Sequence, residues 1–212
     1  MSEQIHKRRK RYKGTHPRNF EEKYKELLKK LYAILKPLGY RKEASDYRLF
    51  RPDGLAQIVN IQRNKNNTAQ CCMFTINIGV YFEKGDVLSN RKFKEYDCQI
   101  RKRVKSEENE EWWIIENDTD MESLMESLQT ILGHIEKWFD NFISKEETIH
   151  RILDKSAETF SDTMIMSYPT AKLIAEMGYS MEVYELIKDT RITNPKAIKL
   201  IELADQLKST IN

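Results

Sequence analysis

The stretch CMFTINIGVYF, residues 72–82, sets the fold because its side chains alternate in character along its whole length. One face of the strand that it predicts is apolar and carries Cys72, Phe74, Ile76, Ile78, Val80 and Phe82. The opposite face is mixed and carries Met73, Thr75, Asn77, Gly79 and Tyr81. This two-residue period predicts a strand whose apolar face packs on a core and whose other face is more polar.

Residues 55–63 predict a neighbouring strand, because a Pro-Asp-Gly turn signal at residues 52–54 precedes them. Slipping either strand by one residue would move its apolar side chains to the wrong side of the sheet, so the pattern also predicts the register. We expect Leu55, Val59 and Ile61 to share the apolar face. The mixed face then receives Ile58, Asn60 and Gln62.

The flanking segments complete a two-layer α+β fold. Apolar residues at helical spacing predict a first helix over about residues 20–36 and a long helix from Met121 to Phe142. Shorter strands are expected at residues 47–51, between Cys98 and Val104, and at residues 112–115, while residues 83–97 read as an irregular connection. The sequence thus predicts a meandering antiparallel sheet of about five strands, flanked by the two helices.

Three parts are expected along the chain: a basic disordered tail at 1–18, the α+β domain at 19–155, and a small all-helical extension at 156–212. Capping residues and Pro or Gly boundaries predict the short helices of this extension. Short helices bury little surface alone, so they either dock on the α+β domain or form part of a helical repeat. With so few units we favour docking.

The formal net charge of +3 is a cancellation between unlike segments. The tail has one acidic residue, giving +6, and its basic residues are Lys7, Arg8, Arg9, Lys10, Arg11, Lys13 and Arg18. Residues 91–105 add seven basic residues against two acidic ones, and four glutamates follow between residues 107 and 111. Basic clusters of this kind either contact nucleic acid or a membrane surface, or they serve as solvated segments.

Composition and length exclude several classes of protein. A hydrophobic fraction of 40% in 212 residues supports a packed core and argues against wholesale disorder. No apolar run approaches the roughly 20 residues that span a bilayer, and no signal peptide is recognised. We therefore expect a cytoplasmic protein without a membrane partner, whose three cysteines are reduced.

Several motifs together resemble a bacterial family of domains of unknown function, DUF4304, over roughly residues 20–153. They are the segment Leu35–Tyr40 (LKPLGY), Tyr47 and Phe50, Val59–Gln62 (VNIQ), Phe74–Gly79 (FTINIG), and Trp112, Trp113 and Ile115. The resemblance implies a bacterial or phage source and a fold of this type. It implies no catalytic or binding residues, because none are established for that family.

The residues offer little sign of catalysis. The sequence has no glycine-rich phosphate loop, no nucleophile elbow and no metalloprotease motif. The four histidines are dispersed without Cys or acidic partners at metal-ligand spacing, so no metal site and no cofactor are expected. An enzyme whose residues come from distant strands is a third hypothesis, which a deep pocket with clustered titratable groups would support.

Candidate binding residues lie on the mixed sheet face. Rigid strands would present the polar groups of Asn60, Gln62, Thr75, Asn77 and Tyr81 there, which suits recognition of a peptide, loop or ligand. The alternative is that the C-terminal helices cover this face and the polar groups satisfy one another. Of the adjacent tryptophans 112 and 113, one should anchor the core and the other lie beside Tyr81; Trp113 is the residue assigned to the site.

Two functions follow. The first is a non-enzymatic protein that binds an unidentified protein through the mixed face or the C-terminal helices, as in bacterial conflict systems. The second is nucleic-acid binding through the tail and the basic strip, with Arg101 and Arg103 as strip residues. The sequence does not indicate an oligomeric state.

Overall fold

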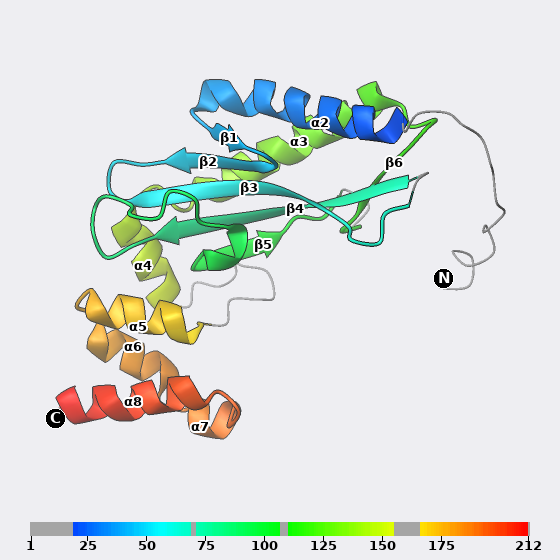
Figure 1. Cartoon of the computed structure of the whole chain (residues 1–212). Coiled ribbons are helices and arrows are strands. Elements are labelled where there is room, and N and C mark those ends of the chain that lie inside the picture. The colour runs from blue at the N-terminus through cyan, green and yellow to red at the C-terminus, as the bar shows by residue number, and fades with distance from the viewer. Residues whose placement is uncertain (1–18, 69–70, 107–109, 155–165, 212) are drawn as a thin grey trace.

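The computed structural model describes residues 19–68, 71–106, 110–154 and 166–211. Its centre is a six-stranded antiparallel sheet (Figure 1). The strands are β1 (Arg41–Glu43), β2 (Asp46–Phe50), β3 (Leu55–Arg63), β4 (Cys71–Phe82), β5 (Ile100–Arg103) and β6 (Trp113–Glu116). They follow a meander from β1 to β5, and β6 then returns to pair with the first residues of β4. The predicted α+β fold is confirmed, with one short strand more than expected.

The register of the two central strands agrees with the sequence pattern. Val59 of β3 lies opposite Ile78 of β4, and Asn60 lies opposite Asn77. All the apolar side chains expected on one face are fully or almost fully buried there. The alternating pattern alone was therefore sufficient to place both faces correctly.

Two helices cover the apolar face of the sheet, α2 (Asn19–Leu35) and α3 (Met121–Phe139), which also pack on each other (Figure 1). A 3-10 turn, η1 (Lys36–Leu38), ends α2, and Gly39 follows it with a φ of 94°, a left-handed conformation that glycine adopts without strain. Asp120 caps α3 by accepting a hydrogen bond from the backbone N–H of Glu122 at 3.0 Å.

The opposite face, called the open face below, is partly covered by the β4–β5 connection, residues 83–99. This connection contains a short 3-10 turn, η2 (Glu95–Asp97). It buries Leu88, Phe93 and Cys98 against the sheet as a second, smaller apolar cluster. The sequence predicted an irregular connection here but did not predict that it folds back over the sheet.

Helices follow from residue 145 onward: α4 (Lys145–Leu153), α5 (Tyr168–Glu176), α6 (Ser180–Ile187), α7 (Thr190–Thr193) and α8 (Ile198–Ile211). Helices α5, α6 and α8 pack on one another, and α6 contacts α4. Figure 1 shows α5 to α8 grouped beyond the edge of the sheet, so the β4–β5 connection, and not these helices, lies over the centre of the open face. The predicted tail and the predicted boundary at residues 155 and 156 lie outside the described residues.

Among these described helices, none has the length and apolar character that crossing a membrane requires.

Candidate binding site on the open sheet face

Strand pairing aligns polar residues in a row across the open face. Asp46 of β2 lies opposite Asn60 of β3, Asn60 lies opposite Asn77 of β4, and Asn77 lies opposite Arg103 of β5. Because the sheet is antiparallel and in register, all four side chains project from the same face. The row runs from one side of the sheet to the other.

Hydrogen bonds connect this row from end to end. The Asn60 amide donates to Oδ1 of Asp46 at 2.6 Å, and the Asn77 amide donates to Oδ1 of Asn60 at 3.2 Å. The Asn77 amide also donates to Oε1 of Gln62 at 2.8 Å. Nε of Arg103 donates to Oδ1 of Asn77 at 3.2 Å, which extends the network to β5.

A buried ion pair anchors one end of the network. Nη2 of Arg48 lies 2.7 Å from Oδ2 of Asp46, and both side chains are only 3% exposed. Nζ of Lys94, from the β4–β5 connection, contacts the same carboxylate oxygen at 2.7 Å. Arg48 also donates to the carbonyl of Phe93 at 2.9 Å and contacts Oε2 of Glu43 at 3.1 Å. The ion pair therefore fastens the connection to the sheet.

The structure brings together three of the predicted binding residues, Asn60, Gln62 and Asn77. Their amide groups bond to one another and to Asp46 and Arg103. These three side chains therefore follow the alternative prediction, in which the polar groups of the mixed face hydrogen-bond to one another. Through these bonds they hold Asp46 and Arg103 at the two ends of the row.

Thr75 and Tyr81 also lie on the open face, but neither is free to meet a partner. Thr75 is fully buried, and its hydroxyl has no hydrogen-bond partner among the described residues. The Tyr81 ring stacks on Phe93 with the ring centroids 4.3 Å apart, and its hydroxyl donates to Glu83 at 2.8 Å. Burial and this hydrogen bond raise the pKa of Tyr81 well above its ordinary value.

The placement of Trp113 on the open face was wrong. Trp113 pairs with Phe74, stacks on it with centroids 5.8 Å apart, and is 7% exposed among the core residues under the helices. The neighbouring Trp112 takes the other side and packs against the Arg103 guanidinium, 5.7 Å from the ring centroid. Adjacent residues do face opposite ways, but the sequence did not show which of the two enters the core.

A cleft opens at the β5 end of the polar row, with a cavity volume of about 620 Å³. We call it the β5 cleft, and its polar lining includes Asn77, Glu95, Tyr96, Arg101, Arg103 and Glu111, with Gln99, Lys102 and Ser167. Tyr96 belongs to η2 and is 67% exposed. Among the described residues, it is the aromatic side chain with the greatest exposure. Sequence reasoning missed Tyr96 as a site residue, although an aromatic residue within a charged loop was a usable signal.

The charged groups of the β5 cleft partly pair with one another. Arg101 lies 4.0 Å from Oε1 of Glu95, and Arg103 lies 3.4 Å from Oε2 of Glu111. Burial raises the pKa of Glu95, an effect that the nearby arginines only partly oppose. The cleft therefore offers two guanidinium groups, two carboxyl groups and a phenol within one open depression, a set suited to polar recognition.

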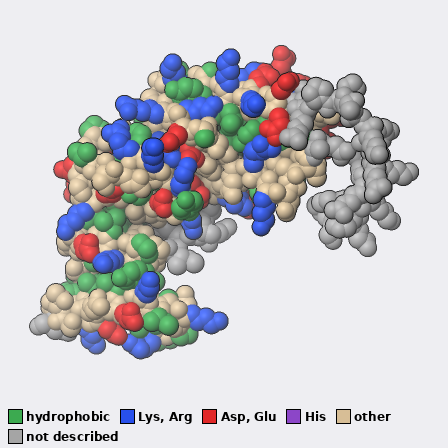
Figure 2. Space-filling view, viewed as in Figure 1, with side chains coloured by type: hydrophobic (Ala, Val, Ile, Leu, Met, Phe, Trp, Pro, Cys, Tyr) green, Lys and Arg blue, Asp and Glu red, His purple; other side chains and the backbone are tan. Residues whose placement is uncertain are grey.

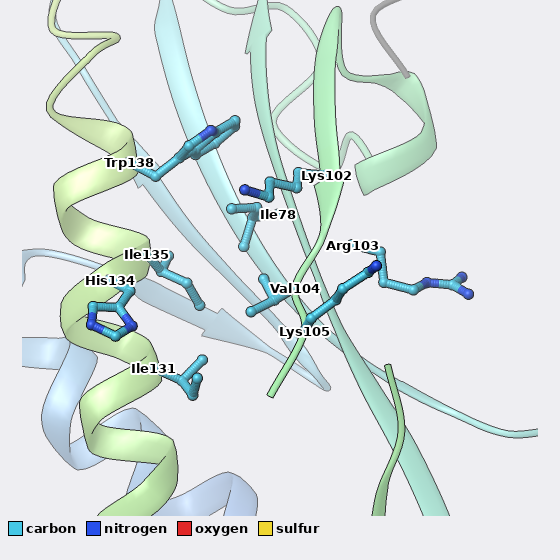
Figure 3. Close-up of a pocket in the computed structure, with 9 residues that line it drawn as sticks. All are labelled: Ile78, Lys102, Arg103, Val104, Lys105, Ile131, His134, Ile135 and Trp138. Atoms are coloured by element: carbon cyan, nitrogen blue, oxygen red, sulfur yellow. The ribbon is translucent and has the colours of Figure 1, made fainter. Parts of the chain in front are cut away.

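A second cavity of about 320 Å³ lies on the other side of β5, between the sheet and α3. Figure 3 shows Ile131 and Ile135 pointing from α3 toward Ile78 and Val104 of the sheet. In the same view Lys102 points to this side of β5, while Arg103 points away from α3. Arg103 also lines the β5 cleft. We call this mostly apolar space the α3 cavity.

The predicted nucleic-acid residues separate into groups that the structure treats differently. Arg101 and Arg103 lie together in the β5 cleft. Arg91, from the same basic strip, packs on the Phe50 ring at 4.5 Å and lines a separate cavity with Arg41. Figure 2 shows basic and acidic side chains interspersed over this view of the molecule. The predicted tail residues Lys7 to Lys13 lie outside the described part of the chain.

Neither the cysteines nor the acidic residues form a metal centre within the described segments, where no group of three or more metal-ligating side chains occurs. All three cysteines are free. Cys72 belongs to the core under the helices, whereas Cys98 belongs to the apolar cluster on the open face. Burial raises the pKa of Cys98 well above its ordinary value, which favours the unreactive thiol.

The fold and the cleft define a small α+β protein whose open sheet face carries a polar, mixed-charge depression at one edge. The family model for the domain of unknown function DUF4304 matches residues 31–141, and the chain belongs to this family. The resemblance expected from the sequence is thereby confirmed, over a somewhat shorter range than residues 20–153.

Other comparisons add little about activity. A stretch of 31 residues is 64% identical to ribosomal RNA small subunit methyltransferase H 1 of Lachnoclostridium phytofermentans. That match covers 15% of this chain and 8% of the methyltransferase. No solved structure matches the chain.

Proposed function

We propose that this protein is a non-enzymatic binding protein that recognises another protein at the β5 cleft. The observation that carries the proposal is the combination of an exposed Tyr96 with the guanidinium groups of Arg101 and Arg103 at one depression. Tyrosine and arginine are enriched at the energetic centres of protein interfaces. The hydrogen-bonded row behind the cleft holds Arg103 in place before a partner arrives, which reduces the entropy cost of binding.

The charges of the cleft favour a protein partner over a nucleic acid. Glu95 and Glu111 each pair with one of the arginines, so the cleft does not present the continuous row of cations that follows a phosphate backbone. A protein surface can complement both signs of charge at once.

A capture experiment from the expressing cells tests this proposal. The wild-type chain is the bait, and the captured protein is identified by mass spectrometry after chemical cross-linking. We expect the Tyr96→Ala and Arg101→Ala baits to lose the captured protein at least tenfold. A Lys137→Ala bait should retain it, because Lys137 is an exposed cation on α3 and lies outside the cleft. Equal capture by all four baits would refute the assignment of the site.

Nucleic-acid binding is the second candidate function, supported by the run of cations at Arg101, Lys102 and Arg103 and by the basic tail. A gel shift at low salt tests it directly with a single-stranded oligonucleotide. Binding that weakens steeply with salt supports this candidate, and no shift at low salt argues against it.

The wider setting belongs to the same proposal. It includes a bacterial or phage source, a cytoplasmic location and a role in a defence or immunity module. Three unpaired cysteines fit a reducing compartment. Expression in the source organism followed by fractionation tests the location.

A further inference from the structure

Within the described part of the chain, strand β5 lies at an edge of the sheet. It pairs with β4 on one side, and among the described residues no strand pairs with its other side. The backbone N–H of Val104 donates to the carbonyl of Ile76 at 2.9 Å, which fixes the hydrogen-bonded positions of this antiparallel pair. Because these positions alternate, the main-chain groups of Arg101 and Arg103 point away from β4, toward this edge.

The two cavities described above lie on opposite faces of the sheet and meet at this edge. Both are lined in part by Lys102 and Arg103 of β5. Successive side chains of a strand point to opposite faces, so a strand added beside β5 would send alternate side chains into the α3 cavity and the β5 cleft. Main-chain pairing with alternate pockets is the geometry by which proteins bind extended peptides at a sheet edge.

The lining of each cavity indicates what those side chains would be. The α3 cavity has an apolar surface formed by Ile78, Val104, Ile131, Ile135 and Trp138, and it is also lined by Lys102, Arg103, Lys105 and His134. It therefore fits an apolar side chain that lies close to basic groups. On the side of the β5 cleft, Arg101 and Arg103 belong to β5 itself and would lie beside an added strand, whereas Glu95 and Glu111 come from neighbouring segments. Acidic side chains of the strand are complementary to these two arginines. Basic residues on an edge strand also discourage unwanted strand pairing, so the charge alone indicates no ligand. The cavities on both sides of the edge supply the second observation.

We propose that β5 binds an extended segment of the partner protein, with acidic and apolar residues in alternation, as an added strand. This inference rests on the proposed protein-binding function and specifies the form of the ligand. The acidic residues face Arg101 and Arg103, and the apolar residues enter the α3 cavity beside Ile131.

Fluorescence anisotropy with a labelled seven-residue peptide, Glu-Leu-Glu-Val-Glu-Leu-Glu, tests the proposal on the full chain. We expect saturable binding, and at least tenfold weaker binding when lysine replaces every glutamate. N-methylation of the peptide backbone at one alternate set of residues should abolish binding, whereas methylation at the other set should leave it unchanged. No binding of the parent peptide, or equal loss with both methylated peptides, would overturn the proposal.

A pair of protein variants separates the contribution of the Arg101 main-chain N–H to peptide affinity from that of its side chain. Arg101→Ala removes the cation and keeps the outward N–H, while Arg101→Pro removes both, and proline is tolerated on an edge where that N–H faces outward. We expect Arg101→Pro to bind the peptide at least tenfold more weakly than Arg101→Ala, at an unchanged melting temperature. Equal affinities of the two variants would contradict strand addition. If Arg101→Pro does not fold, the methylated peptides still test whether the peptide pairs with the main chain of β5.

The outcomes distinguish this inference from the function on which it rests. Capture of a cellular protein that depends on Tyr96, together with no peptide binding, would leave the proposed function standing and reject strand addition. Loss of both would reject both. Tighter binding of a single-stranded oligonucleotide than of the peptide, at equal salt, would also overturn the inference in favour of nucleic acid.

Discussion

At the scale of single residues, Asp46 connects β2, β3 and the β4–β5 connection on the open face. Its carboxylate meets Arg48, Lys94 and Asn60 at 2.6 to 2.7 Å, and it is almost fully buried. A buried ion pair contributes little net stability compared with apolar residues of similar volume. Removal of one partner, however, leaves an uncompensated charge. Asp46 is therefore a site where a small change has a large effect.

We predict that Asp46→Ala destabilises the protein by about 3 kcal/mol, because Arg48 stays buried without its main counter-ion. In a chain of this length that loss corresponds to a decrease of about 6–12 °C in melting temperature, measured by differential scanning fluorimetry. Asp205→Ala is the matched control, since its pair with Arg191 has the same 2.7 Å length but both side chains are 65% exposed. We expect that control to change stability by less than about 1 kcal/mol. Similar losses in the two variants would contradict the role given to burial.

Single residues also show where sequence patterns stop being informative. Alternation correctly predicted that residues 112 and 113 face opposite ways, but it gave no means of choosing between them. The choice is made by the pairing of Trp113 with Phe74, an interaction between residues far apart in the sequence. Asn60, Gln62 and Asn77 were likewise placed on the correct face, whereas their bonds to Asp46 and Arg103 depend on register across four strands.

At the scale of elements, the β4–β5 connection is the part that the sequence predicted least well. Leu88 and Phe93 are isolated apolar residues in a charged stretch, so no period marks them as core. Glu83 organises the start of this connection. Its carboxylate accepts hydrogen bonds from the N–H and hydroxyl of Ser89, from the N–H of Asn90, and from the Tyr81 hydroxyl.

The pKa of Glu83 leads to a prediction about pH. Burial raises this pKa, but the hydrogen bonds outweigh burial and lower it from 4.5 to about 2. The folded-state pKa is thus below the unfolded one, so the ionised carboxylate stabilises the fold above about pH 4.5, and that stability is lost as the pH falls toward about 2. We expect Glu83→Gln to melt at a lower temperature than wild type at pH 7, with the difference shrinking between pH 4.5 and 2. Thermal melts across that range measure it, and a difference independent of pH would contradict the assignment.

At the scale of the whole molecule, the fold was largely predictable and the binding site was only partly so. Strand 71–82 alternates strongly and pairs with strand 55–63, whose pattern is weaker because Gln57 lies on the core face. The local pattern was still sufficient to predict their faces and their register. The β5 cleft forms where η2, β5 and Glu111 meet, and no local period brings these segments together. The sequence placed Asn60, Gln62 and Asn77 on the face that carries the polar row, whereas the β5 cleft lies at the β5 edge of that face.

The whole-molecule charge balance gives the last prediction, which concerns the basic tail. Deletion of residues 1–18 removes seven basic residues and one acidic one, leaving a body with 29 basic and 32 acidic residues and a formal charge of −3. The core begins with the buried Phe20 of α2, so we expect the melting temperature of the shortened chain to stay within about 2 °C of that of the full chain, since substitutions away from buried features change stability by about 0.5 kcal/mol or less. On single-stranded nucleic acid, each phosphate that a protein neutralises adds about 0.7 to the slope of log K against log salt. If the tail binds phosphates, its deletion should reduce this slope by about 0.7 for every phosphate that the tail neutralises. A slope that is unchanged by the deletion, in gel shifts at several salt concentrations, would assign any such binding to Arg101 and Arg103 of the folded body.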